Sequence, residues 1–281
     1  MEVIDISSET EEEMSWVYWE SLVDNERDCL AVTGFTPEDF LKLFAIVSNR
    51  VAPDKDHTKE DRLIMVLYYL KHSPSITKLK EVFSVTKKKV SAILDETIHG
   101  IYMILYQHYV ENLPDNNERN EDFLNSNYLL NTVFQPILVT SKKKRYYSEE
   151  HQTCGFKSQC LHNRQGLIVD CIPGIKGKMT AKEIYEEYEN ISKDDDIILA
   201  NDCYRGSGNV VVSYQNPGNK HQLMFNKKLG NELSLTDKFY QRMKSRHRIL
   251  LVKFCKSQRE YKKIFKLCVA LTNFHVLENP L

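Results

Sequence analysis

The sequence predicts a mixed α/β (α+β) protein with a helical first part, including a helix-turn-helix-like unit, and a second part built on a mixed sheet flanked by helices. Residues 1–110 contain repeated helix starts, each followed by apolar residues at helical spacing. Residues 128–281 alternate between strand-like and helical segments. Residues 111–127 are polar and rich in Asn and Asp, so we expect a linker between two domains there.

The helical part is predicted from its N-cap signals. Thr36 and Thr58 each precede acidic residues and then an apolar stripe, and Pro37 stands at the first helical position after Thr36. Both patterns are typical of a helix start. Further helices are expected at 11–24, 76–83 and 87–106.

A short helix, a turn and a longer helix with a basic start predict a helix-turn-helix at residues 76–106. Lys87, Lys88 and Lys89 begin the second helix, where base and phosphate contacts are usually made. A plain helical bundle with solvated lysines is the alternative, because this part of the chain is acidic. The sequence leaves both interpretations open.

The second part is predicted to alternate strands and helices. Strand-like runs cover 129–140, continued around Tyr146 and Tyr147, and then 155–162, 166–172 and 196–200. Helices are expected at 180–188, 235–244 and 258–274, with 249–254 extended between the last two.

Charge is divided unevenly along the chain. Residues 1–130 hold 13 Lys/Arg and 24 Asp/Glu, whereas residues 131–281 hold 25 and 15. The two parts are therefore expected to meet different partners or each other, and a merely uneven solvated surface is the alternative.

Composition excludes several classes of protein. No apolar run approaches the ~18 residues of a membrane span, and the acidic N-terminus is not a secretory signal, so we expect an intracellular protein. The seven cysteines are scattered, and we expect them to be reduced. Cys154, Cys160 and His162 fit the spacing of no common zinc finger. No phosphate-cradling loop or Ser/His/Asp set is found.

Two basic clusters are candidate nucleic-acid contacts through phosphates. Docking against the acidic first part and simple solvation are the alternatives. The clusters consist of Lys142, Lys143, Lys144 and Arg145, and of Arg242, Lys244, Arg246, His247 and Arg248.

A leader of two segments and five further segments resemble, in their order along the chain, the PIF/Harbinger branch of the DDE transposases. In the first part, GFTPEDFLKLF and the helix-turn-helix FSVTKKKVSAIL are similar to the usual leader of that family. In the second, LLNTVFQPI and ILANDCYRG resemble its two catalytic strands, and LTDKFYQRMKSRHRIL resembles the helix with its catalytic Glu. The segment from Arg145 to Gly174 and the closing ALTNFHVLENPL also match. The resemblance covers residues 34–281 and implies an RNase H-like catalytic domain.

The resemblance also places the catalytic positions. Asn131 stands at the first Asp position, Asn201 at the second and Asp237 at the Glu position. DDE enzymes hold two Mg²⁺ or Mn²⁺ ions with three carboxylates, and hard divalent ions need charged oxygen ligands. Two amides remove two of the three charges, so we expect neither a resident metal ion nor catalysis.

A rebuilt metal site is the alternative. Asp170, Asp202 and Asp237 together supply three carboxylates, and a one-residue change of register brings Asp202 into use. Adjacent strand residues point to opposite faces, so Asp202 faces the site only if its strand has already ended. This alternative implies a Mg²⁺- or Mn²⁺-dependent endonuclease.

The resemblance implies a nuclear binding role for an inactive member. Active elements of the family encode a partner with a Myb/SANT- or MADF-like domain, so a partner of that kind, or another subunit of a chromatin complex, is expected, along with DNA. The first candidate surface for a partner is aromatic and includes Trp16, Trp19, Phe40 and Phe44, although core packing is the favoured explanation of these residues. A homodimer through the leader helices follows by analogy alone.

Overall fold

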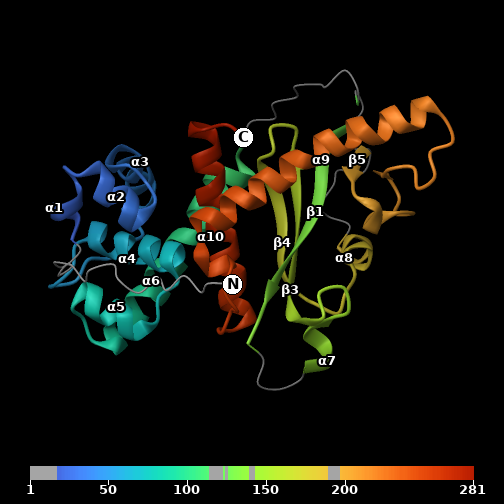
Figure 1. The fold of residues 1–281 in the computed structure, drawn as a ribbon. Helices are drawn as coiled ribbons and strands as arrows, with labels where there is room; N and C mark the ends of the chain where they lie inside the picture. The colour runs from blue at the N-terminus through green and yellow to red at the C-terminus, as the bar shows by residue number, and fades with distance from the viewer. Residues whose placement is uncertain (1–17, 114–122, 124–125, 139–142, 189–196) are drawn as a thin grey trace, which may run out of the picture. The chain divides into compact units, whose positions relative to one another are not determined.

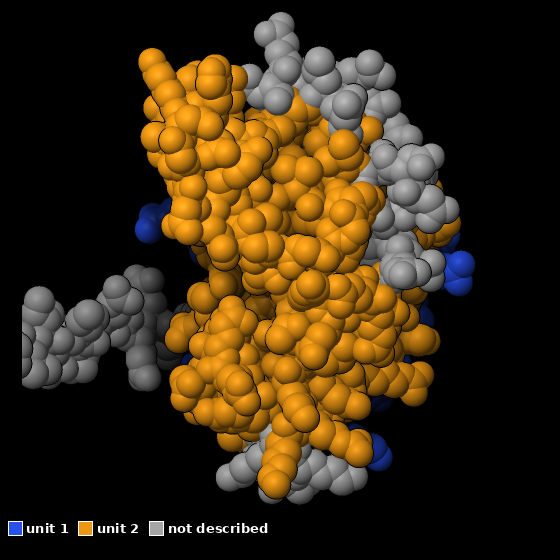
Figure 2. Space-filling model, turned by 90° about the vertical axis from the view of Figure 1, so that its right-hand side faces the viewer, with its two compact units in different colours: residues 1–69, 74–97 blue, residues 70–73, 98–281 orange. Residues whose placement is uncertain are grey.

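The computed structural model describes residues 18–113, 123, 126–138, 143–188 and 197–281. The chain divides into two compact units, coloured separately in Figure 2. The first comprises Met1–Tyr69 and Pro74–Thr97, and the second comprises Leu70–Ser73 and Ile98–Leu281. Among the described residues, no helix combines the length and the apolar character needed to cross a membrane.

The first unit is helical, as the sequence predicts. Thr36 accepts a hydrogen bond from the backbone N–H of Asp39 and begins its helix as predicted. Ser75 caps the fifth helix in the same way. The helices are α1 (Trp19–Leu22), α2 (Glu26–Thr33), α3 (Pro37–Val47), α4 (Lys59–His72), α5 (Ile76–Phe83) and α6 (Lys87–Tyr106), the ends of α4 and α6 belonging to the second unit.

Helices α5 and α6 form the predicted helix–turn–helix succession. Ser84 ends α5 in the left-handed conformation, with φ of 48°. Val85 and Thr86 complete the turn, and α6 begins at Lys87. The division between the two units falls within α6, after Thr97. Most of the polar segment 111–127 lies outside the described residues, so the linker expected there stays a prediction.

The second unit is built on a six-stranded mixed sheet (Figure 1). Strand β3 pairs antiparallel with both β1 and β4, whereas β5 pairs parallel with β1 and with β6. Spatial order along the sheet is therefore β4, β3, β1, β5, β6, with β2 paired to the start of β3. The strands are β1 (Ser126–Pro136), β2 (Tyr147–Ser148), β3 (Thr153–Asn163), β4 (Ile168–Lys176), β5 (Ile197–Ala200) and β6 (Val210–Val211).

Helices cover both faces of the sheet. On one face, Leu130 and Ala200 pack against Tyr185 of α8 (Ala181–Glu187). On the other, Leu129 and Leu199 pack against Leu229 of α9 (Lys220–Arg246). Helix α9 crosses the strands towards α10 (Gln258–Glu278), as Figure 1 shows. This arrangement confirms the predicted fold class, a helical N-terminal region followed by a mixed sheet flanked by helices, consistent with an RNase H-like fold.

Three segments differ from the prediction. Helix α9 starts at Lys220, well before the predicted 235, because its first half is mostly polar and its stripe of Phe225, Leu229 and Leu233 is obscured by the exposed Leu223 and Met224. Lys143–Tyr146 is the short helix α7, not a continuation of the first strand. Within 249–254, a single 3-10 turn at Arg248–Leu250 comes first, and only Phe254 pairs with Ile137 in a parallel bridge.

Candidate functional site

Strand pairing brings Asn131 and Asn201 side by side. Leu130 of β1 is paired with Ala200 of β5 in parallel register, so the next residue of each chain segment is Asn131 or Asn201. Leu129 and Leu199 both face α9, and side chains alternate along extended backbone. Asn201 is itself extended, with φ −78° and ψ 173°. Both amides therefore lie on the α9 face of the sheet.

Helix α9 adds the third position. The Nδ2 of Asn131 donates to Thr236 Oγ1 at 2.9 Å, which holds this turn of α9 against β1. Asp237 is the next residue and is exposed. Asn131 and Asp237 both line a groove of about 520 Å³ between β1 and α9. Strand register thus places Asn131 beside Asn201, and Asn131 shares the groove with Asp237. These are the positions at which the sequence analysis expects the catalytic carboxylates.

The two amide oxygens are already engaged within the chain. Asn131 Oδ1 accepts from the backbone N–H of Thr132 at 2.7 Å. Asn201 Oδ1 accepts from the backbone N–H of Cys203 at 3.3 Å and from its Sγ at 2.6 Å. Burial raises the pKa of the Cys203 thiol to about 11, so the thiol keeps its proton and can donate. Asn201 acts here as the cap of the 3-10 turn Asp202–Tyr204.

These residues do not fit a pair of divalent metal ions. Hard ions such as Mg²⁺ and Mn²⁺ need several charged oxygen ligands, and a two-metal site shares carboxylates between the ions. Of the three converging positions, only Asp237 carries a charge. Moreover, the two amide oxygens are committed to backbone and thiol donors.

Asp170 and Asp202 of the alternative carboxylate set lie at separate parts of the sheet. Strand β5 has ended before Asp202, whose Oδ1 accepts from Arg205 Nη2 and Ser213 Oγ, each at 2.6 Å. Asp170 lies on β4, which is separated from β5 by β3 and β1, or about 14 Å at the usual spacing of strands. The Tyr106 hydroxyl donates to Asp170 at 3.4 Å, and burial raises the pKa of this carboxyl.

The groove has a basic and aromatic end. Lys244 of α9 and His151 both line it. The His151 ring stacks on Phe134 of β1 with ring centres 4.1 Å apart. Burial lowers the pKa of His151, and the cations Lys157 and Lys244 lower it further, against the opposing effect of Glu150. His151 is therefore neutral at physiological pH.

Sequence reasoning missed much of this groove. His151 and Phe134 carried no signal, because only the fold brings residues 134 and 151 into contact. Tyr240 and Gln241, which also line the groove, could have been found. They follow Asp237 at the i+3 and i+4 positions of a helix, and Lys244 follows at i+7, so one stripe carries all four.

The basic residues of the second unit occupy different environments. Arg242 donates to the backbone carbonyls of Asn279 and Pro280, and so anchors the end of α10 to α9. Arg246 is half-buried and Arg248 is exposed. In the other cluster, Lys144 and Arg145 are exposed on α7, Lys142 lies outside the described residues, and Lys143 is described only in its backbone.

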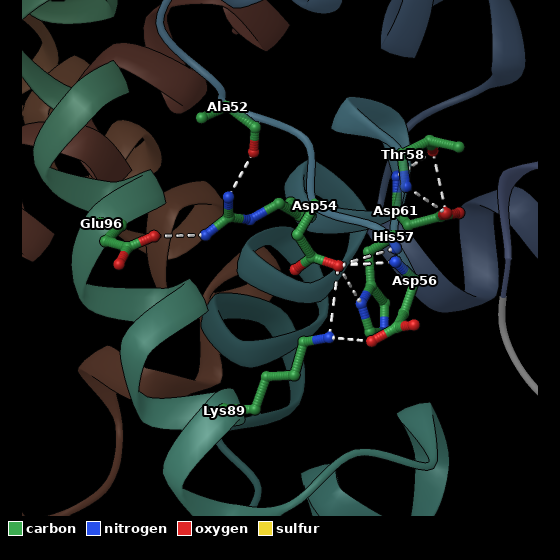
Figure 3. Close-up of polar contacts among 9 residues, drawn as sticks. Ala52, Asp54, Asp56, His57, Thr58, Asp61, Lys89 and Glu96 are labelled. Carbon is green, nitrogen blue, oxygen red and sulfur yellow. Dashed lines mark hydrogen bonds and ion pairs between the residues drawn. The ribbon is translucent and has the colours of Figure 1, made fainter.

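Lys87 and Lys88 are exposed in the first unit, but Lys89 is paired (Figure 3). The ammonium of Lys89 lies 2.5 Å from Asp56 Oδ2 and 3.2 Å from Asp54 Oδ1. The Asp56 carboxylate, to which it donates, raises the pKa of Lys89. Asp54, Asp56 and His57 place their ligand atoms within 4.8 Å of one another. Because Lys89 already pairs with both carboxylates, the group is an ion-pair cluster.

The aromatic residues of the leader pack with each other. Trp19 stacks on Phe40 at 4.5 Å between ring centres, and Phe40 on Phe44 at 6.2 Å. Phe40 is fully buried, whereas Trp19 and Phe44 are half-buried, and Trp16 lies outside the described residues. The backbone N–H of Trp19 donates to Asp61 Oδ1. Phe40 therefore belongs to the core of the first unit.

Of the zinc candidates Cys154, Cys160 and His162, the histidine has both ring nitrogens engaged within the chain. His162 is buried on β3, with Nδ1 at 2.9 Å from the Gly166 carbonyl oxygen and Nε2 at 3.1 Å from the Tyr240 hydroxyl. Both ring nitrogens are thus used within the chain, and burial lowers the pKa of His162 to about 4.

Comparison with known proteins agrees with this geometry. A family model described as DDE superfamily endonuclease matches residues 132–273, which is half of the chain. The matched segment contains Asn201 and Asp237 and begins immediately after Asn131. A search of curated proteins and a search of solved structures returned no match.

Proposed function

The chain belongs to the DDE superfamily of endonucleases, and from that membership we propose that it is a catalytically inactive, transposase-derived protein that acts by binding. The proposal is that a member of the PIF/Harbinger type has kept the fold and the DNA-facing groove and has lost the chemistry. One observation carries it: two of the three converging positions are amides, and both amide oxygens already accept hydrogen bonds.

The physical argument concerns charge. Phosphodiester cleavage by two metal ions requires carboxylates that hold the ions and offset their charge. A single exposed carboxylate at Asp237 binds a divalent ion only weakly, because water competes for it. The Nδ2 of Asn131 also donates a hydrogen bond to Thr236 Oγ1, which an ionised carboxylate cannot do because it only accepts.

The binding role is that of an adaptor in a DNA- or chromatin-associated complex of the nucleus. Its resemblance to transposases that work with a Myb/SANT- or MADF-like protein supports a partner of that kind. The acidic first part and basic second part support contacts with more than one partner. Exposed Lys87 and Lys88 at the start of α6 support a DNA contact by the helix-turn-helix.

Restoring the carboxylates tests the catalytic half of the proposal. The wild-type chain is compared with an Asn131→Asp/Asn201→Asp double variant by calorimetric titration with Mn²⁺ and by nicking of supercoiled plasmid. We expect measurable Mn²⁺ binding in the double variant alone. Adding Asp237→Asn to the double variant should abolish that gain, and Lys238→Gln on the exposed surface of α9 serves as the matched control.

The opposite result would identify an active enzyme. Wild-type nicking that depends on Mn²⁺ and disappears on Asp237→Asn or Asp202→Asn would support the displaced-site endonuclease instead. The adaptor half is tested by affinity purification of the tagged full chain from nuclear extract with mass spectrometry. Recovery of a Myb/SANT- or MADF-domain protein, or of a chromatin complex, is the expected outcome, and a chain that purifies alone contradicts it.

A further inference from the structure

One wall of the groove is a single helical stripe. Asp237, Tyr240, Gln241 and Lys244 occupy positions i, i+3, i+4 and i+7 of α9, which share one face of a helix. The opposite wall is β1 from Asn131 to Pro136. The groove, at about 520 Å³, is of the size of small-ligand sites in proteins.

A pair of stacked aromatic rings, Phe134 and His151, lies in this groove. The Phe134 ring packs closely against the backbone at Gly155, where any Cβ would overlap it. Gly177 approaches the same ring, so a Cβ there would lie 3.3 Å from Phe134 Cε2. His151 then stacks on Phe134, with an angle of 21° between the planes, and its side chain is 37% exposed. Phe134 thus supports one face of the imidazole, and part of the imidazole is exposed in the groove.

Charges in the groove are ordered along its length. Asp237 and Lys244 are seven residues apart, or about 10 Å along the helix axis. Asn131 bonds to Thr236 next to Asp237, whereas Phe134, on which His151 stacks, lies three residues further along β1, so this pair is at the Lys244 end of the groove. Asp237 repels a phosphate at the other end, which orients any ligand that carries one.

We propose that this groove binds an unpaired nucleobase together with its phosphate, the base stacking on His151 and the phosphate pairing with Lys244. Unpaired bases expose their π-faces and stack on aromatic side chains, whereas bases within a duplex are already stacked. The inference rests on the proposed function, because it assigns a ligand to a groove that binds without cutting. A free nucleotide and a base in a single strand share this chemistry.

The test is fluorescence anisotropy with a labelled single-stranded oligothymidylate, in EDTA and with the full chain. Replacing His151→Ala should weaken binding by about 5- to 100-fold, since one stacked base contributes that much affinity. His151→Phe keeps a ring and should bind within about threefold of wild type. Lys244→Gln should also weaken binding. His221→Ala and Lys238→Gln change exposed residues of α9 outside the groove and are the matched controls.

Two results would overturn the proposal: equal affinities of the His151→Ala and His221→Ala proteins, or a loss in His151→Phe as large as in His151→Ala. The second excludes stacking even if His151→Ala were poorly folded. Competition with thymidine monophosphate separates the two sources: displacement identifies a free nucleotide as sufficient, and displacement only by unlabelled oligonucleotide identifies a strand. Because the assay contains EDTA, Mn²⁺-dependent nicking would defeat the proposed function while leaving this binding result intact.

Discussion

Asn273 of α10 ties three buried backbone groups together, and its replacement should destabilise the second unit strongly. Its Oδ1 accepts from the N–H of Ile168 at 3.1 Å, and its Nδ2 donates at 2.7 Å to the carbonyls of both Ile168 and Tyr109. The side chain is fully buried. It therefore supplies both hydrogen bonds that a neighbouring strand would give to the first residue of β4.

The magnitude follows from the groups left without partners. Asn273→Leu has a similar volume but leaves one N–H and two carbonyls unsatisfied in the interior. Each such group costs about 1–3 kcal/mol, and partial relaxation reduces the sum, so we expect a loss of about 3–5 kcal/mol. This is a large part of the ~5–15 kcal/mol by which a typical protein is stable.

The assay is urea unfolding followed by circular dichroism, with hydrogen exchange of a peptide covering Ile168 as the local measurement. Asn231→Leu, an exposed change on α9, is the matched control and should alter stability by no more than about 0.5 kcal/mol. A loss below ~1 kcal/mol in Asn273→Leu, with unchanged exchange at Ile168, would refute the reasoning.

Three further predictions concern other buried groups. The pKa of His162 is lowered to about 4, below its unfolded value near 6.5, so its contribution to stability is present above pH 6.5 and is lost as pH falls towards 4. In urea unfolding at a series of pH values, a His162→Gln protein should lose less stability over that range than wild type. An equal dependence of the two unfolding free energies on pH contradicts this. Gly155→Ala should lower stability by at least ~2 kcal/mol, because the new Cβ would lie 2.5 Å from the Gln135 carbonyl oxygen and overlap Phe134; thermal unfolding checks it, and a melting temperature equal to that of wild type rules it out. Asp61→Ala should lower the free energy of unfolding by about 2–4 kcal/mol, because the buried carboxylate accepts hydrogen bonds from two backbone N–H groups and a hydroxyl. The exposed Asp24→Ala change is the control and should leave denaturant unfolding unaltered. Equal unfolding free energies of the two variants contradict the prediction.

Local signals made the helices of the first unit predictable. Thr36 begins α3 as predicted because its capping bond joins residues three apart, and α4 likewise starts at Lys59, directly after Thr58. Helix α9 shows the limit of this reasoning. Its first half carries exposed Leu223 and Met224 beside the packed Phe225 and Leu229, so its apolar residues do not fall on one face and the amphipathic pattern is obscured.

The sequence also indicated which residues to examine as the candidate site. Asn131, Asn201 and Asp237 were identified from short motifs alone, and the parallel register of β1 with β5 brings the two amides together. No motif could show that both amide oxygens are already engaged, or that Asp202 is paired with Arg205. Those facts depend on the turn that follows β5 and on the placement of α9.

By itself, the sequence determined the fold class and the helix starts after Thr36 and Thr58, because these depend on residue identity and on bonds between near neighbours in the chain. Tertiary structure alone decided which charges remain available and what lines the groove. Lys89 is joined to Asp54 across 35 residues, and His151 meets Phe134 only through the sheet. Electrostatic and stacking energies depend on distances in space, and chain order does not contain those distances.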